Sequence, residues 1–93
     1  MNLEKKYEEI KKKIEKGEHE PALESLAIII EENPDEDNAY YLRGNIYRKQ
    51  QDWQNAINNY TMAIELNPES PAVGARKMCI EILNFFNTDL YNH

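Results

Sequence analysis

The sequence predicts an all-α domain of short antiparallel helices, and three observations carry this prediction. Apolar residues recur at spacings of three and four along most of the chain, which is the period of an amphipathic helix. Helix-breaking signals at Gly17, Pro34, Gln51-Asp52 and Pro68 divide the chain into segments of about helix length. Strand signals are weak, because no Asn-Gly or Asp-Gly hairpin turn occurs anywhere. We therefore expect five helices.

The first two segments each carry one apolar stripe at helical spacing. The stripe residues are Leu3, Tyr7, Ile10 and Ile14 in the first segment, and Leu23, Leu26, Ala27 and Ile30 in the second. Gly17 ends the first helix, and Pro21 stands near the start of the second, where its missing N–H costs little. These segments predict two short helices that run antiparallel.

The third and fourth segments have the same organisation. The third begins at about Asp37, which offers Asp37 or Asn38 as a cap, and the fourth begins near Asp52. The residues expected to be buried are Tyr40, Gly44 and Tyr47 in the third segment, and Ala56, Tyr60, Ala63 and Ile64 in the fourth.

An internal repeat relates the two pairs of segments. Asn33-Pro34-Asp35 and Asn67-Pro68-Glu69 lie thirty-four residues apart. A thirty-four-residue unit of two helices is the period of the tetratricopeptide repeat, and residues 37–70 resemble that family closely. The matching residues are Tyr40, Gly44, Tyr47, Ala56, Tyr60, Ala63 and Pro68. Arg43 departs from the pattern, since the family usually has Leu there.

Residues 3–36 resemble a degenerate copy of the same unit. Ala22 and Pro34 match, but Ile10 stands where the glycine belongs and Lys13 where the tyrosine belongs. The register of the first helix stays open, because the stripe formed by Tyr7, Ile10 and Ile14 would fit a shifted or rotated helix better. The resemblance implies one domain over residues 1–93, with two antiparallel hairpins and a capping helix in a right-handed superhelical array.

The expected capping helix, residues 71–90, is unusually apolar. Its broad apolar arc consists of Ala72, Ala75, Met78, Cys79, Ile82, Leu83, Phe85, Phe86 and Leu90. One interpretation is a helix set deeply against the second repeat, with its tail folded over the edge. The other is an exposed patch that pairs with a second copy or another partner. That patch would consist of Met78, Ile80, Phe85 and Phe86.

Charge and composition narrow the function classes. The net charge of −6 disfavours nucleic acid, which needs clustered Lys and Arg. The lysine-rich opening is interleaved with glutamates, which favours a solvated, ion-paired helix face over contact with lipid. No nucleophile, phosphate loop or metal cluster is apparent: His19 lies among glutamates, and His93 is the last residue. We expect no enzyme, metal or cofactor, no membrane partner, and a buried Cys79 in a reducing, cytoplasmic setting.

Resemblance to the family implies a concave groove that binds a peptide or protein. Its expected lining is Asn38, Tyr41, Asn45, Arg48 and Lys49, with Lys11 or Lys12 from the first unit and Ala72, Ala75 and Arg76 from the third. Such a groove would be mildly basic and suit an acidic or carboxylate-bearing peptide, although Arg48 and Lys49 also fit a solvated helix end. The carboxylate-binding residues of chaperone-binding members are not present as a set. The sequence thus predicts a binding adaptor or scaffold, with self-assembly through the last helix as the alternative.

Overall fold

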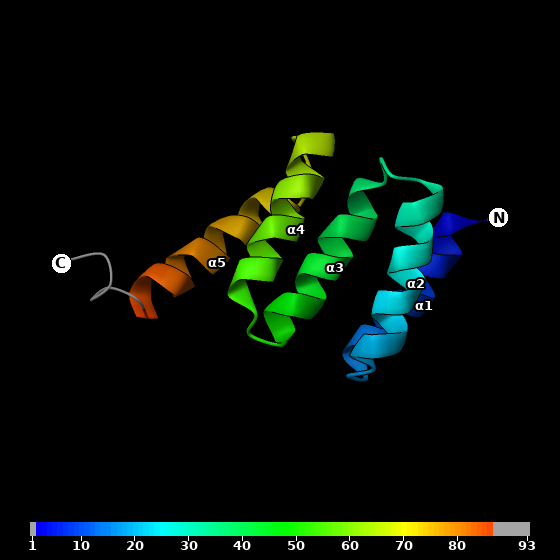
Figure 1. Cartoon of the computed structure of the whole chain (residues 1–93), viewed down its shortest axis with the longest axis horizontal. Helices are drawn as coiled ribbons and strands as arrows, with labels where there is room; N and C mark the ends of the chain where they lie inside the picture. Colours follow the sequence, from blue (N-terminus) through cyan, green and yellow to red (C-terminus); the bar gives the residue numbers. More distant parts are fainter. Residues whose placement is uncertain (1, 87–93) are drawn as a thin grey trace.

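The structure, a computed structural model, describes residues 2–86, and these form five α-helices and no strand. In chain order the helices are α1 (Leu3–Glu15), α2 (His19–Glu32), α3 (Asp37–Lys49), α4 (Trp53–Leu66) and α5 (Ala72–Phe86). They lie along one long axis, with α1 and α2 at one end and α5 at the other (Figure 1). The all-α prediction of consecutive hairpins and a final helix is confirmed. Positions 87–90 of the expected capping helix and His93 lie outside the described residues.

The turns inside the two hairpins have the same backbone geometry. Gly17 and Gln51, thirty-four residues apart, both adopt positive φ, +79° and +60°. In each turn the amide of this residue donates three residues back, and the next amide donates five back, which closes the helix end. The bonds are Gly17 N to Ile14 O (3.0 Å), Glu18 N to Lys13 O (2.8 Å), Gln51 N to Arg48 O (2.9 Å) and Asp52 N to Tyr47 O (2.8 Å). The second turn therefore holds a non-glycine residue in a strained conformation.

A first core joins α1, α2 and α3. Its buried residues are Tyr7, Ile10, Ile14, Ala22, Leu26, Ile29, Ala39, Leu42 and Ile46. The predicted stripe of the first helix is thus correct, with Leu3 at its edge. The stripe predicted for the second helix needs a correction: Ala27 is exposed and Ile29 is buried. Ala27 lies on the side of α2 away from Ala22 and Ile29, and alanine is too small to define a stripe by itself.

A second core joins α3, α4 and α5. Its buried residues are Tyr40, Ala56, Tyr60, Ala63, Ala72 and Cys79. Gly44 permits this packing, because a Cβ built there would lie 2.6 Å from Cε1 of the fully buried Tyr60. Tyr47 and Ile64, both expected to be buried, are half-buried and pack at the edge of the core.

The start of α3 differs from the prediction, whereas that of α4 agrees with it. Glu36 occupies the cap position of α3 without a side-chain bond, and Asp37 is the first helical residue. The Asp37 carboxylate instead accepts a hydrogen bond from Asn67 Nδ2 at 3.1 Å, which ties this helix start to the end of α4. The fourth helix begins next to Asp52 as expected, and Asp52 caps it, since its Oδ1 accepts from the Asn55 amide at 3.3 Å.

Arg43, the departure from the family pattern, is explained by a polar contact within the second hairpin. Its Nε donates to Asn59 Oδ1 at 2.6 Å, and its guanidinium lies 5.4 Å from the centre of the Tyr40 ring. Asn59 is buried, so its side-chain oxygen needs a donor from inside the protein. Arginine supplies that donor while its stem and planar head cover apolar surface.

Candidate functional site

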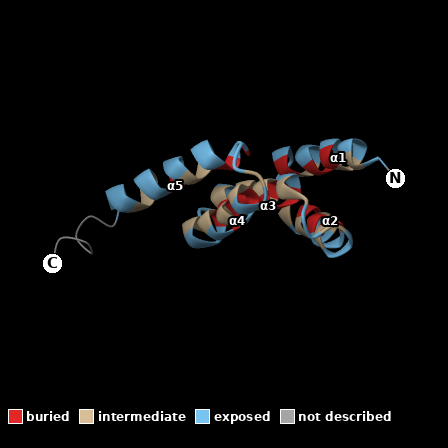
Figure 2. Ribbon diagram, turned by 90° about the horizontal axis from the view of Figure 1, so that it is seen from above, coloured by how far each residue is buried: buried red, intermediate tan, exposed pale blue. Residues whose placement is uncertain are grey.

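The helices form two layers, which leaves one face lined by the first helix of each pair. Seen along a perpendicular direction, α1 and α5 lie on one side, α2 and α4 lie on the other, and α3 runs between them (Figure 2). A hollow of about 190 Å³ opens where α1, α3 and the turn before α5 meet. Its lining residues are Tyr7, Lys11, Asn38, Tyr41, Leu42 and Pro71. We call this hollow, with its extension over α1, the α1–α3 groove.

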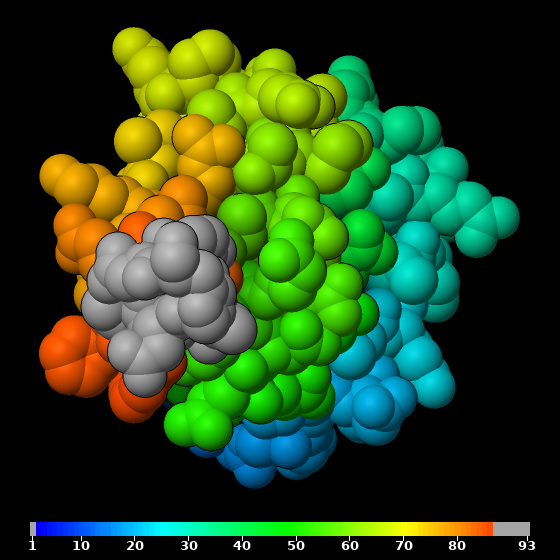
Figure 3. All heavy atoms as spheres, turned by 60° about the vertical axis from the view of Figure 1, so that its left-hand side comes forward, coloured from blue at the N-terminus to red at the C-terminus, as the bar shows by residue number. Residues whose placement is uncertain are grey.

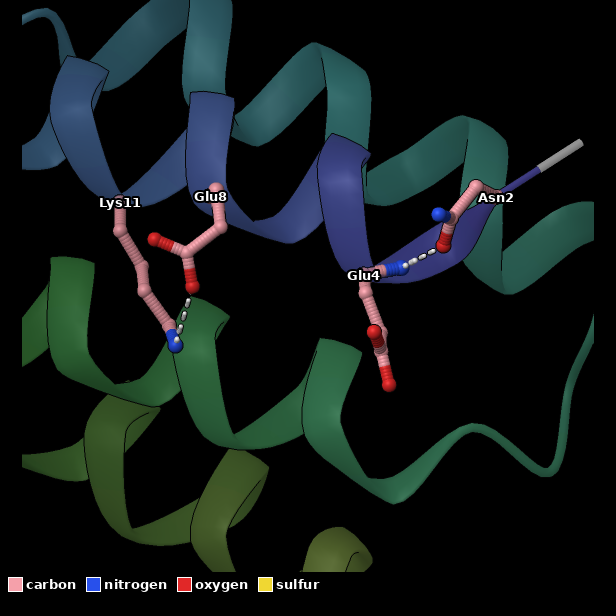
Figure 4. A network of polar contacts seen from close by, with 4 residues as sticks. All are labelled: Asn2, Glu4, Glu8 and Lys11. Carbon is pink, nitrogen blue, oxygen red and sulfur yellow. Dashed lines mark hydrogen bonds and ion pairs between the residues drawn. The ribbon is translucent and has the colours of Figure 1, made fainter.

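The extension over α1 is wider and more polar. It has a volume of about 430 Å³ and is lined by Asn2, Glu4, Lys5, Tyr7, Glu8, Lys11 and Asn38. Figure 4 shows Glu8 and Lys11 pointing from α1 towards α3, and Asn2 capping the first turn through the Glu4 amide. Lys11 Nζ lies 3.5 Å from Glu8 Oε1, and both side chains are largely exposed. Such a pair is weak, so both groups can exchange it for a partner's charges.

Charge is graded along α1 and α3, the two helices beside the groove. The first turns of α1 and α3 carry Glu4 and Asp37, whereas the last turns carry the basic residues Lys12, Lys13, Arg48 and Lys49. Each charge complements the dipole of its own helix. The two helices beside the groove are therefore acidic at their starts and basic at their ends, although Lys12 and Lys13 are not among the residues that line it.

Asn45 and Tyr41 are fixed by contacts with Tyr60, a residue of the second core. Asn45 Oδ1 accepts a hydrogen bond from the Tyr60 hydroxyl at 2.6 Å. The Tyr41 and Tyr60 rings lie 6.0 Å apart, centre to centre. Burial is the main cause that raises the pKa of Tyr60 to about 12, so its hydroxyl remains a donor at neutral pH. These contacts preorganise two of the predicted groove residues.

Arg48 lies beside the same tyrosine at the basic end. Its positive charge counteracts part of the rise in the pKa of Tyr60, and also part of the rise that burial causes in the pKa of Cys79. The Arg48 Nε atom is buried and has no hydrogen-bond partner among residues 2–86. Lys49, the next residue, is exposed.

Tyr7 contributes to the groove although the sequence did not single it out for binding. Burial first, and then the charges of Glu36 and Asp37, raise the pKa of Tyr7 to about 12. The buried hydroxyl has no hydrogen-bond partner within the described part of the chain; Glu36 lies nearby but does not meet the geometry of a hydrogen bond. The sequence predicts that Tyr7 is a core residue, and it is one, but its exposed edge also lines the hollow.

The expected contribution of the last helix to the groove differs from that of α3. Ala72 is fully buried and Ala75 packs against the same core, so Ala72 cannot contact a peptide. Arg76 Nη1 donates to Thr61 Oγ1 of α4 at 3.2 Å. Pro71, at the edge of the hollow, is instead the residue that this part of the chain supplies. Of the predicted set, the structure brings Asn38 and Tyr41 together with Lys11.

The apolar residues of α5 form a second surface. Met78, Ile80, Phe85 and Phe86 are exposed by 55%, 40%, 76% and 73%. A shallow hollow of about 240 Å³ is lined by Met78, Glu81, Ile82, Phe85 and Phe86. The two phenyl rings pack edge to face, with centres 5.4 Å apart. Residues 2–86 therefore leave much of the predicted patch open to solvent, and the suggested cover by the tail concerns residues outside the described range.

In the region from residue 2 to residue 86, no group of three or more His, Cys, Asp or Glu side chains is arranged to hold a metal ion. Among the same residues, no helix has the length and apolar character needed to cross a membrane.

Comparisons with known proteins support the repeat and the fold. The family model described as tetratricopeptide repeat matches residues 38–70, which is the second hairpin and its closing turn. The solution NMR structure of Bacteroides fragilis protein BF1650 is similar over most of both chains, with 55% sequence identity and a TM-score of 0.84. The alignment covers 91% of this chain and 87% of that one. No curated protein matches the chain.

Proposed function

The chain belongs to the tetratricopeptide repeat family, whose members typically act as non-catalytic protein-interaction modules, and we propose on this premise that it binds a partner's peptide in the α1–α3 groove. One observation carries the proposal: the hollow of about 190 Å³ combines apolar walls from Tyr41 and Leu42 with polar groups from Lys11 and Asn38. A pocket that combines apolar walls with a few polar groups suits a peptide side chain.

The gradient of charge gives the proposed ligand a composition and a direction. An apolar side chain would enter the hollow, and acidic residues would follow it towards Arg48 and Lys49 at the ends of the helices. Arg48 and Lys49 would repel basic residues of the ligand at that end. The proposed partner is therefore a protein segment that carries an apolar anchor beside an acidic stretch, met in the cytoplasm. This role needs neither nucleic acid nor membrane.

The test uses charge reversals on one helix. The probe is a phage-displayed library of random peptides, selected on the natural protein and then measured on variants by fluorescence anisotropy. Lys11→Glu places a negative charge in the hollow, whereas Lys12→Glu makes the same change on an exposed neighbour outside the lining. We expect Lys11→Glu to weaken binding about tenfold and Lys12→Glu to leave it nearly unchanged.

Two outcomes bear on the groove directly. Selected peptides rich in acidic and apolar residues, sensitive to Lys11→Glu alone, support it. Peptides that bind all variants equally well indicate a site elsewhere on the protein. We leave Asn45 unchanged in this test, since its removal would deprive the buried Tyr60 hydroxyl of its acceptor.

A second candidate function is self-association through α5, and the exposure of Met78, Ile80, Phe85 and Phe86 favours it. Exposed apolar groups of this size commonly mark sites of protein contact. Sedimentation equilibrium of the purified chain tests this candidate: a dimer whose population rises with concentration supports it, and a monomer throughout contradicts it.

A further inference from the structure

The helix α5 corresponds to α3 in the repeat, yet the face that α4 covers on α3 is open on α5. On α3 this face consists of Tyr40, Arg43, Gly44 and Tyr47, which contact the second core or hydrogen-bond to α4. The residues thirty-four positions later are Gly74, Lys77, Met78 and Glu81, and all four are exposed. No helix within residues 2–86 covers them. We call these four residues the open face.

The seating of α5 on α4 explains why this face points outward. Where α3 buries Ala39, Leu42 and Ile46, the corresponding residues of α5 include Val73 and Ile80, which are 45% and 40% exposed. The residues that α5 buries are Ala72 and Cys79. The helix α5 is thus rotated about its own axis relative to α3, and the open face lies opposite Ala72 and Cys79. Figure 3 shows α5 as the outer flank of the molecule beside α4.

We propose that a second copy of this chain occupies the open face by packing its own α5 antiparallel to the first. This inference rests on self-association, the second candidate function, and specifies its geometry. Each α5 would then stand against the other as α4 stands against α3. The arrangement has a twofold axis, so each contact between the two copies occurs twice, as in most homodimers.

The charges on the open face complement themselves in this arrangement. Lys77 and Glu81 lie one turn apart on the exposed side of α5. In an antiparallel pair centred near Cys79, Lys77 faces Glu81 of the second copy, and the twofold axis repeats the pair. A parallel pair in register would instead place Lys77 against Lys77. Charge therefore favours the antiparallel pairing.

The sizes of the side chains also fit an antiparallel pair centred near Cys79. A pairing that brings Lys77 to Glu81 also brings Gly74 close to Phe85 of the second copy, because both pairs are nearly symmetric about Cys79 and Ile80. Nothing in the described structure lies within 4 Å of a Cβ built on Gly74. A phenyl ring could rest there as Tyr60 rests on Gly44. Glycine on one helix and an aromatic ring on the next is the packing already present inside the second hairpin.

The expected dimer is weak. A helix of fifteen residues is roughly 22 Å long, and one helix pair buries less than the roughly 1,200 Å² that begins the range of stable interfaces. We expect a dissociation constant of roughly 10 μM to 1 mM. Such a dimer would form at high local concentration.

The experiment is sedimentation equilibrium of the full chain and its charge variants. Lys77→Glu and Glu81→Lys each put like charges in contact at two symmetric places, and we expect dimerisation to weaken on the order of tenfold. The double variant restores opposite charges with the positions exchanged, and it should dimerise nearly as well as the natural chain. Lys12→Glu and Glu65→Lys are matched controls, because both residues are exposed and lie on other helices. Circular dichroism verifies that every variant is folded.

The outcomes separate the geometry from self-association. Loss in both single variants with recovery in the double variant supports the antiparallel pair. If all three variants dimerise as strongly as the natural chain, the proposed geometry is overturned but self-association is retained. A monomer at every concentration overturns both, and peptide binding by the α1–α3 groove is unaffected by either result.

Discussion

The two hairpins fill the same place with different pairs of side chains. In the second, Gly44 leaves room for the ring of Tyr60, and in the first the corresponding residues are Ile10 and Leu26. All four residues are buried. A very small and a large residue have been exchanged for two of intermediate size. What the fold requires here is the summed volume across the hairpin, and this explains how the first copy can lose the family glycine and remain a repeat.

The largest expected effect comes from placing a residue of the first hairpin's pair into the second hairpin. Gly44→Ile alone forces side-chain atoms into the ring of Tyr60, and we expect a loss of about 3 kcal/mol in the free energy of unfolding. The double variant Gly44→Ile, Tyr60→Leu reproduces the pair of the first hairpin and should recover most of the lost stability. Urea denaturation followed by circular dichroism measures both.

Gly74→Ile is the matched control for steric overlap, since the surroundings of Gly74 are open. It should change stability by less than about 0.5 kcal/mol. Tolerance of Gly44→Ile as a single change would contradict the account based on volume.

The hairpins also differ in a polar contact between their helices. Arg43→Leu restores the usual family residue but leaves the buried Asn59 oxygen without its donor, at a cost of about 1–3 kcal/mol. The lysine contact of the first hairpin, Lys13 Nζ to Ser25 Oγ at 3.4 Å, is longer, and Ser25 is half-buried where Asn59 is buried. Lys13→Leu should therefore cost less than about 0.5 kcal/mol. Equal costs in thermal denaturation would argue against a special role for Arg43.

The turns provide a third contrast, because the same hydrogen-bond pattern and a positive φ occur at Gly17 in one hairpin and at Gln51 in the other. Gln51→Gly removes the strain of a side chain at positive φ and should stabilise the protein by about 1 kcal/mol. Gly17→Gln introduces that strain and should destabilise it by a similar amount. Chemical denaturation of both variants gives the comparison, and effects of the same sign would refute it.

The smallest effects concern one buried tyrosine from each core. Tyr60→Phe loses the bond to Asn45 and should cost about 1 kcal/mol, whereas Tyr7→Phe removes a buried hydroxyl without a partner and should be neutral or slightly stabilising. Both phenols have pKa values of about 12 in the folded protein, against 10.0 when unperturbed. The unfolded chain therefore releases these protons first as pH rises. Their contribution is constant below pH 10 and is lost between about pH 10 and 12.

A pH series of denaturation midpoints for the natural chain and both phenylalanine variants tests this linkage. Each variant should show a shallower fall in stability above pH 10 than the natural chain. If both variants lose stability above pH 10 as steeply as the natural chain, the two tyrosines are not the cause of that loss.

Much of the fold could be predicted because local signals and packing agree. Gly17 and Pro34 end helices, and the stripe of Tyr7, Ile10 and Ile14 has the spacing of a single helix face. Errors arose where a residue type carries little information about its surroundings. Ala27 is compatible with either side of a helix, and Asp37 is suited both to capping and to the bond with Asn67 that it makes.

The candidate site was less predictable from sequence, because it depends on how helices are rotated relative to one another. Asn38 and Tyr41 were expected in the groove from their places in the repeat, and they line the hollow. The turned seating of α5 removes Ala72 from that face. No periodicity in the sequence distinguishes Cys79, which α5 buries, from Met78, which it exposes.

Tyr41 has one further property that follows from its position between the cores. Together with Ile30, it packs against both the first and the second hydrophobic cluster. In a linear array, cooperativity of unfolding comes from such contacts between neighbouring units. A peptide held against Tyr41 would therefore strengthen the junction between the two hairpins as well as occupy the groove. The bound protein should then melt as one unit, with amides of α1 and α4 exchanging their hydrogens at more similar rates than in the free protein.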